Sequence, residues 1–302
     1  MKSKLIVFLT VVLLSAGFIT GTLFANPQIF EAAEALRVAG DRQAAFDLLE
    51  DGLNSAGNNQ EKSEFYWRMA ETYVNMGDDL EDAGGSKAAI MALFEQGEAY
   101  ADMAIQADSG NHVAYYMKSA NVGRWGQTKG IVSSLFKAGD MKEALILAIR
   151  QKENYSNAWN VLSMLYAAVP GRPVSFGNIS FAISLSRMAY DSREEEVRAG
   201  DEEDMGVGIR KEFALHLWDR DWSASKRRRE QNKMKDKYNS TRDLFEKHLY
   251  YEGVATIPNM DDRDEALQIM REVIQYLRDK QDKTVDERKD LEELTEILNE
   301  WT

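Results

Sequence analysis

Residue types that could do chemistry are few in this sequence. The three histidines, His112, His216 and His248, are far apart, and no two have the i, i+4 spacing with which one helix holds a metal ion. The H-E-x-x-H, G-x-S-x-G, phosphate-loop and EF-hand motifs are missing. Zero cysteine excludes thiolate catalysis, thiolate metal sites, disulfides and a lipid-modified Cys. We therefore predict a protein without catalytic residues, metal or cofactor. An enzyme would need an acid and base pair in a cleft, and no motif marks one.

A basic run is set in an acidic chain. The 302 residues include 37 Lys and Arg against 50 Asp and Glu, a net charge of −13, which argues against nucleic acid as the main partner. Lys226, Arg227, Arg228 and Arg229 nevertheless stand together, and three more lysines follow by residue 237. Such a run suits an acidic partner or anionic lipid headgroups. Alternatively it neutralises the acidic segment 192–204, and we favour this second interpretation.

A second charged segment is rich in glycine. Arg124, Trp125 and Lys129 interrupt an otherwise apolar helix, and three glycines surround them: Gly123, Gly126 and Gly130. Arg124 and Lys129 are suited to hold a carboxylate, since the glycines allow a ligand to approach the backbone. Alternatively the segment is a glycine-kinked helix whose charged residues pair with nearby acids, and both interpretations stay open.

Residues 1–25 have the pattern of a secretory signal peptide. Lys2 and Lys4 precede an apolar stretch from Leu5 to about Ala25, and Ala25 is a small residue of the kind that signal peptidase cleaves after. We expect cleavage after Ala25, although the 21 residues from Leu5 are also long enough for an uncleaved anchor. The rest of the chain is exported in either case, and an exported chain without cysteine fits a bacterial periplasm. A lipoprotein is excluded because there is no Cys to modify.

The elements that must position these residues are helices. Only four prolines occur, and Ala, Leu, Glu and Met are abundant. A pattern of large and small residues three to four apart recurs in segments 36–53, 66–78 and 158–171, and Gly40-Asp41 makes a tight reversal within the first. A large residue near a small one lets consecutive helices pack closely. One pair cannot bury its own apolar stripe, so the pairs are expected to stack.

This spacing resembles the tetratricopeptide repeat family, whose 34-residue unit is a pair of helices. The clearest unit matches with Trp159, Leu162, Ser163, Tyr166, Ala182 and Ala189. Two earlier units match with Ala32, Ala33, Leu36, Gly40 and Ala45, and with Tyr66, Met69, Ala70, Tyr73 and Gly77. The chain departs from the family at the long stretch 79–96 and at an insertion, 170–178. The resemblance implies a right-handed solenoid of helix pairs.

Two segments, 121–136 and 157–178, show a narrower likeness. They resemble the divergent repeat proteins that accompany periplasmic TRAP-type transporters and, distantly, the eukaryotic regulators of microtubule dynamics. The first likeness implies an exported helical repeat protein that docks a solute-binding protein, with a homo-oligomer as one form.

The tetratricopeptide resemblance also implies a binding face. In that family the fifth position of each first helix lines the concave surface, and here that position holds Phe30, Trp67, Tyr116 and Asn160. Three aromatic residues in succession suit an extended peptide, a helix or an apolar small ligand. Alternatively insertions or the C-terminal helices cover this face and the aromatic residues belong to the core.

We therefore expect an all-α, tetratricopeptide-like solenoid with C-terminal capping helices. The expected divisions are a signal peptide (1–25), repeats with insertions (26–191), an acidic loop (192–206) and C-terminal helical pairs (207–302). The expected function is non-catalytic binding of a protein partner or ligand on the concave face. The more specific prediction is that the partner is the solute-binding component of a transporter. The alternative is a cell-envelope scaffold that binds proteins through its outer surface. We do not expect nucleic acid as a partner. We expect contact with a membrane only if residues 1–25 remain as an uncleaved anchor.

Overall fold

The computed structural model describes residues 26–202 and 204–302, and the signal peptide predicted for residues 1–25 lies outside them. In this part of the chain every regular element is a helix. The first half contains α1 (Pro27–Val38), α2 (Arg42–Leu53), α3 (Asn59–Asp82), α4 (Lys87–Ala107), α5 (His112–Lys129), α6 (Ile131–Ser134), the 3₁₀ turn η1 (Leu135–Lys137) and α7 (Ala138–Gln151). The second half contains α8 (Ser156–Ala168), α9 (Ile179–Ala199), α10 (Val207–Arg220), α11 (Ala224–Ser240), α12 (Leu244–His248), η2 (Tyr251–Gly253), α13 (Asp262–Asp279) and α14 (Val285–Trp301).

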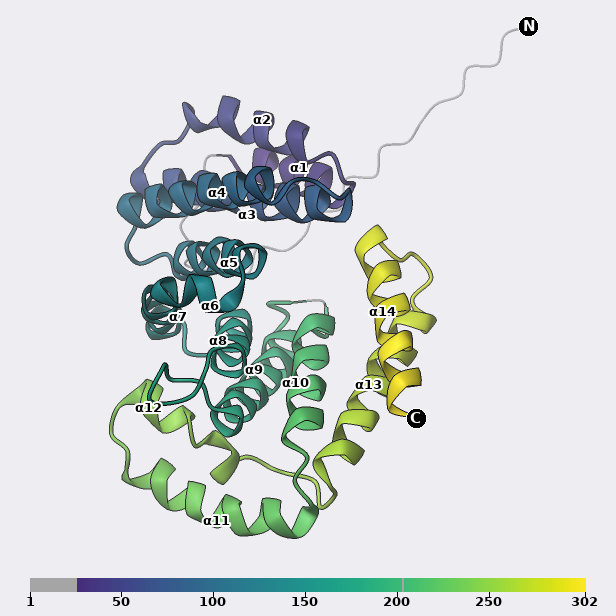
Figure 1. The fold of residues 1–302 in the computed structure, drawn as a ribbon. Coiled ribbons are helices and arrows are strands. Elements are labelled where there is room, and N and C mark those ends of the chain that lie inside the picture. The colour runs from purple at the N-terminus through teal and green to yellow at the C-terminus, as the bar shows by residue number, and fades with distance from the viewer. Residues whose placement is uncertain (1–25, 203) are drawn as a thin grey trace, which may run out of the picture.

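Neighbouring helices pack in pairs that form one curved stack (Figure 1). The α1–α2 pair lies at one end, followed by α3–α4, α5 with α7, and α8–α9. The all-α, helical-repeat fold predicted from the large and small residues is therefore confirmed.

Side-chain caps and close helix contacts explain why the pairs form where they do. Asp41, Asn58 and Asn111 each accept a hydrogen bond from the backbone at the start of a helix. Gly97 on α4 faces the side chain of Asn121 on α5, and a Cβ at residue 97 would lie 1.9 Å from the Asn121 Oδ1. Only glycine therefore permits this approach of α4 to α5.

The acidic segment predicted as a loop at 192–206 is helical over its first half. Helix α9 continues to Ala199, because its buried stripe includes Ser192, Arg193 and Glu196. The Glu196 carboxylate accepts hydrogen bonds from the backbone N–H of Ser156, at 3.2 Å, and from the Ser156 hydroxyl, at 2.5 Å. The prediction of a solvated loop was wrong here, since this acidic residue binds the first residue of α8.

One of the C-terminal helix pairs joins helices that are not consecutive in the chain. Helix α10 packs mainly against α13, whereas α11 packs against η2 and α12. The expected pairing of consecutive helices after residue 207 is wrong at α11. The only buried residue of α11 is Arg227. Helix α11 therefore has no apolar stripe to pack against α10.

Helices α13 and α14 double back along the side of the stack (Figure 1). Leu294 of α14 is fully buried in the cluster that also contains Phe213 and Leu217 of α10. Trp301 stacks on Trp218 with ring centroids 4.2 Å apart. The start of α14 reaches the first two pairs, because Lys289 Nζ lies 2.5 Å from an oxygen of Asp82 at the end of α3.

His216 makes the fold sensitive to pH. It is buried on α10, its Nδ1 lies 2.8 Å from the Ser186 Oγ, and burial lowers the pKa of His216 to about 4. The unfolded chain binds this proton near pH ~6.5, so stability is present above that pH and is lost as pH falls toward ~4. We expect His216 to cost about 2–3 kcal/mol of unfolding free energy between neutral pH and pH about 4.5. Urea unfolding at both pH values should show a smaller loss for His216→Gln than for wild type; an equal loss would contradict this assignment.

Candidate ligand pocket on the concave side

A pocket of about 350 Å³ lies between α3, α5, α8 and the segment from Ser134 to Met141. This volume is at the lower end of the ~300–1,000 Å³ typical of small-molecule sites. Most of the lining is apolar: Val74, Ala120, Val122, Leu135, Ala138, Met141, Val161, Met164, Leu165, Ala168 and Val169. The pocket is therefore suited to an apolar group rather than to a charged one.

Glycines on α5 leave the space for this pocket. Gly123 and Gly126 both line it. A Cβ at residue 123 would lie 3.0 Å from the Met141 Cε, and one at residue 126 would lie 3.1 Å from the Ser134 Oγ. Gly123 and Gly126 therefore lie against α7 and the end of α6, while Gly130 caps α5, which is one continuous helix.

The cations near the pocket are already paired with acids. Arg124 lines the pocket, but its guanidinium lies 2.6 Å from Asp78 and 2.7 Å from Glu81, both on α3. Lys137 Nζ lies 2.6 Å from an oxygen of Glu98. Burial raises the pKa of Asp78 above its ordinary value, and Arg124 opposes that rise. This geometry favours the interpretation in which Arg124 pairs with nearby acids over the one in which it holds a ligand carboxylate.

Neutral polar side chains also line the pocket: Tyr116, Ser119, Gln127, Ser134 and Asn160. Asn160 of α8 has its Nδ2 only 4.0 Å from the Met164 sulfur, and its buried Oδ1 has no hydrogen-bond partner. Tyr116 of α5 packs edge-on against Tyr155 with ring centroids 5.5 Å apart. Burial, with a contribution from the nearby Glu71 carboxylate, raises the pKa of Tyr116 to about 12, so the phenol is neutral at physiological pH. Asn160 Oδ1 is thus a buried acceptor without a partner, in a lining that is mostly apolar.

Of the four residues predicted for the concave face, two line the pocket and two do not. Tyr116 and Asn160 line the pocket together. Trp67 is half-buried and packs in a cluster with Tyr116, while its Nε1 is buried without a hydrogen-bond partner. Phe30 does not line a groove: it is 6% exposed, packs edge-on against Phe65 at 4.7 Å and is covered by the guanidinium of Arg68. The prediction for Phe30 was wrong because α1 turns this residue into the core of the first pairs.

Trp125 and Lys129 lie outside the pocket. The Trp125 ring is buried against Ile90 and Phe94 of α4, and its Nε1 donates a hydrogen bond of 2.9 Å to Glu95. Lys129 is exposed, and its Nζ lies 5.9 Å from the centroid of the Trp125 ring. Neither side chain lines the pocket, because the rotation of α5 directs Trp125 to α4 and leaves Lys129 in solvent, and their predicted role in binding stays a prediction.

Apart from Asn160, the pocket residues outside α5 carry no recognisable sequence signal. Leu135, Met141, Val161 and Met164 read as ordinary core residues of helices. Their role depends on the angle between α5, α7 and α8, which is a property of the tertiary packing.

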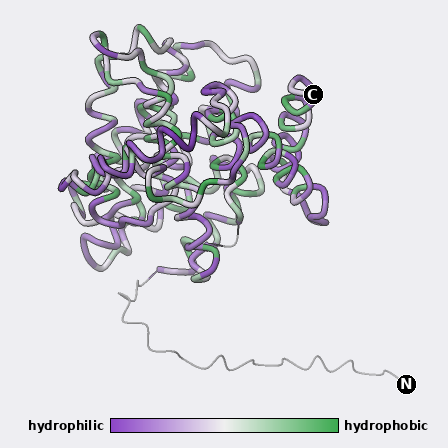
Figure 2. The backbone as a smooth tube through the Cα atoms, turned by 90° about the horizontal axis from the view of Figure 1, so that it is seen from below, coloured by the Kyte–Doolittle hydropathy of each residue, from purple (hydrophilic) through white to green (hydrophobic). Residues whose placement is uncertain are grey.

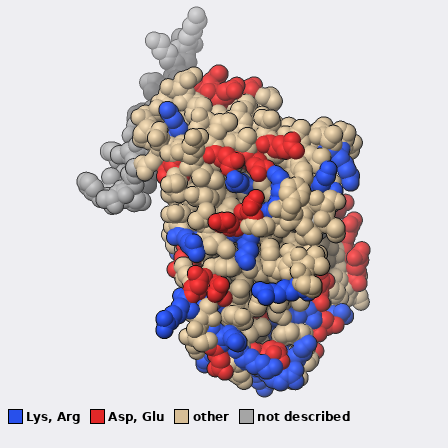
Figure 3. Space-filling view, turned by 60° about the vertical axis from the view of Figure 1, so that its left-hand side comes forward, with Lys and Arg blue, Asp and Glu red and all other residues tan. Residues whose placement is uncertain are grey.

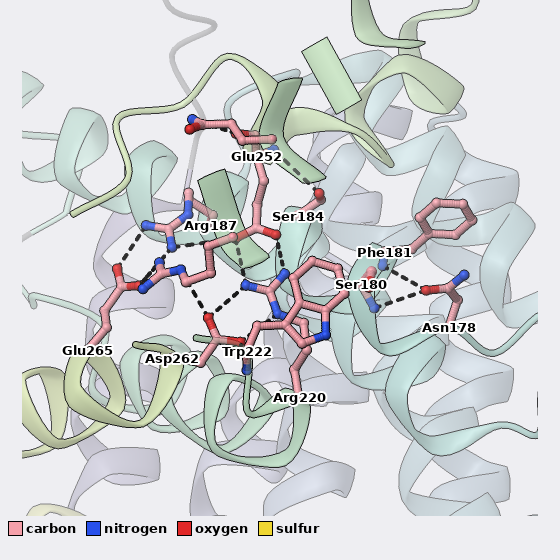
Figure 4. A network of polar contacts seen from close by, with 12 residues as sticks. Asn178, Ser180, Phe181, Ser184, Arg187, Arg220, Trp222, Glu252, Asp262 and Glu265 are labelled. Carbon is pink, nitrogen blue, oxygen red and sulfur yellow. Dashed lines mark hydrogen bonds and ion pairs between the residues drawn. The ribbon is translucent and has the colours of Figure 1, made fainter. Parts of the chain in front are cut away.

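A second group of polar residues is a buried ion network (Figure 4). Arg220 lies 2.7 Å from Asp262 and also pairs with Glu252; all three side chains are at most 2% exposed. Arg187 lies 3.0 Å from Glu265, while Arg227 lies 3.0 Å from Asp262 and also pairs with Glu265. Three guanidinium groups thus balance three carboxylates and join α9, α10, α11, η2 and α13. The hollow beside Arg220 has no room for a ligand, so we assign this network to stability.

The sequence interpretation missed this network. Arg227 belonged to the basic run in the sequence, whereas the structure buries it and leaves its neighbours Lys226 and Arg228 exposed. The six partners are separated by up to 78 residues, and no local pattern pairs them.

The described part of the chain shows neither a metal-binding cluster nor a membrane-spanning helix. Residues 26–202 and 204–302 contain no cluster of His, Asp and Glu side chains placed to hold a metal ion. Across the same ranges, no helix combines the length and the apolar character needed to cross a membrane.

One family model matches part of the chain. Residues 29–169, just under half of the chain, match the family model described as regulator of microtubule dynamics protein 1-3. No curated protein matches the sequence. The assignment to the tetratricopeptide family, and the narrower one to transporter-associated repeat proteins, is therefore wrong. The reason is physical: large and small residues three to four apart are what any closely packed helix pair requires, so this spacing does not identify one family.

Proposed function

We propose that this protein is a non-catalytic binding protein that takes an apolar ligand in the pocket between α5 and α8. The observation that supports this most strongly is a preformed pocket of about 350 Å³ with a largely apolar lining and one unpartnered acceptor, Asn160 Oδ1. Ligand sites of this kind combine apolar area with a few polar groups that orient the ligand.

The charges around the pocket also support an uncharged ligand. Arg124 and Lys137 are neutralised by Asp78, Glu81 and Glu98, so an anionic group would have to displace an existing partner. Tyr116 is neutral at physiological pH, as any tyrosine is, and burial raises its pKa further, to about 12. The first and last lining residues, Val74 and Val169, both fall within 29–169, so the whole pocket lies in the part of the chain that matches the family model.

The experiment is a titration with N-phenyl-1-naphthylamine, a neutral apolar dye whose fluorescence rises when it leaves water. We expect saturable one-site binding to the folded protein and competition by other neutral apolar molecules. No saturable signal would contradict the proposal. A signal that survives when the pocket is filled would contradict it equally, because exposed apolar side chains elsewhere would then bind the dye.

Export remains part of the proposal through residues 1–25, whose pattern is that of a signal peptide. N-terminal sequencing of the protein from its own cells is the direct check, with Asn26 expected as the first residue.

A further inference from the structure

Helix α11 presents a concentrated group of cations on an acidic protein. Ala224–Ser240 contains seven basic and two acidic residues, a net charge of +5, whereas the chain as a whole carries −13. Six of the seven cations are exposed: Lys226, Arg228, Arg229, Lys233, Lys235 and Lys237. The view from below in Figure 2 faces α11, whose tube is largely hydrophilic, and Figure 3 shows Lys and Arg gathered at the same lower end.

The inner side of α11 is held rigidly. Arg227 is 4% exposed, and its guanidinium also donates a hydrogen bond of 2.7 Å to the Met260 carbonyl. Gln231 donates to the carbonyl oxygens of Glu252 and Ala255 at 3.1 and 3.2 Å. A Cβ at Gly253 would lie 2.3 Å from the backbone nitrogen of Lys235, so η2 and α11 are in direct backbone contact. The exposed cations therefore have fixed positions along one helix.

Most of these six exposed cations form no ion pair with a carboxylate in the described part of the chain. Arg229 and Lys233 share Glu230. Lys226 lies over the Trp222 ring at 4.5 Å, and Arg228 donates to the Asn259 side chain at 2.8 Å. Within the part of the chain that the structure describes, Lys226, Arg228, Lys235 and Lys237 form no ion pair with a carboxylate. The favoured interpretation of the sequence was that the basic run neutralises the acidic segment 192–204. In the structure, Glu202 and Glu194 of that segment pair instead with Arg193 and Arg210.

We propose that the exposed cations of α11 bind an acidic polypeptide segment of a partner protein. Charge complementarity supports this occupant, because exposed cations on both flanks of one helix, four of them without an ion pair, attract an acidic chain. One observation favours a polypeptide over a lipid surface: helix α11 has no exposed large apolar side chain to enter a bilayer.

The test is the binding of a fluorescein-labelled oligoglutamate peptide, followed by fluorescence anisotropy at low and high salt. Wild-type protein should bind the peptide, and high salt should weaken the binding. The variant Arg228→Gln/Arg229→Gln/Lys235→Gln/Lys237→Gln should bind at least about tenfold more weakly. Glutamine keeps the helix propensity close to that of Lys and Arg, and circular dichroism verifies that the variant is folded.

The matched control removes the same number of exposed cations elsewhere, with Lys62→Gln/Arg198→Gln/Arg271→Gln/Arg278→Gln. It should bind the peptide as wild type does. Equal loss in both variants would show that net charge alone governs binding and would overturn the proposal. It would also be overturned if the peptide does not bind, or if α11 binds only phosphatidylserine-containing vesicles and not the peptide.

Discussion

Replacing Arg220 with Ala is expected to lower the free energy of unfolding by about 3–5 kcal/mol. The Arg220 guanidinium is 1% exposed and contacts both Glu252 and Asp262, which are equally buried. Burial lowers the pKa of Arg220, but the two carboxylates outweigh it and hold the pKa above its ordinary value, so the group stays charged. Without it, two buried carboxylates share the remaining arginines, Arg187 and Arg227.

The measurement is urea unfolding followed by circular dichroism at neutral pH. Lys289→Ala is the control, because the Lys289–Asp82 pair also joins distant elements but its side chains are 55% and 60% exposed. That variant should lose less than about 1 kcal/mol. If the two variants lose the same amount, the buried network has no special role in joining α9, α10, α11 and α13.

Replacing Ala120 with Trp is expected to weaken binding of N-phenyl-1-naphthylamine at least about tenfold, which is ~1.4 kcal/mol of binding free energy. Ala120 is half-buried on α5 and lines the pocket, so the indole of the introduced tryptophan is expected to occupy the pocket. The change fills the site and adds no charge. The fold should persist, since the extra volume enters an existing cavity rather than a packed core.

Ala167→Trp is the matched control for this variant. Ala167 is exposed on α8 and does not line the pocket, so the same substitution there should leave dye binding unchanged. Equal weakening by both variants would mean that an added surface indole, and not the loss of the pocket, alters the signal.

The helical pairs were predictable because their determinants are local. Gly40-Asp41 at a turn, Trp159 among small residues and the stripe along α13 all express spacings within one or two helices. The pairing of α10 with α13 was not predictable in this way, because α11, α12 and η2 lie between them in the chain. Arg220 and Asp262 meet only because of that long-range arrangement.

The candidate site was predicted in part for the same reason. Tyr116 and Asn160 line the pocket, since one position counted in successive helices falls on one side of a helical stack, and their role in binding stays a prediction. Phe30, Trp125 and Lys129 do not line it, because the direction of a side chain depends on how each helix is rotated against its neighbours. The ion pairs of Arg124 also depend on α3, which is more than 40 residues away in the sequence.

The central claim is that an apolar ligand enters the pocket, and methionine methyl NMR tests it most directly. Met141 and Met164 line the pocket, whereas Met69 and Met270 are fully buried in other core clusters. On titration of ¹³C-methyl-Met protein with N-phenyl-1-naphthylamine, the Met141 and Met164 signals should shift and saturate together, and those of Met69 and Met270 should stay in place. Ala120→Trp should abolish the shifts. Unchanged Met141 and Met164 signals alongside dye fluorescence would contradict the account.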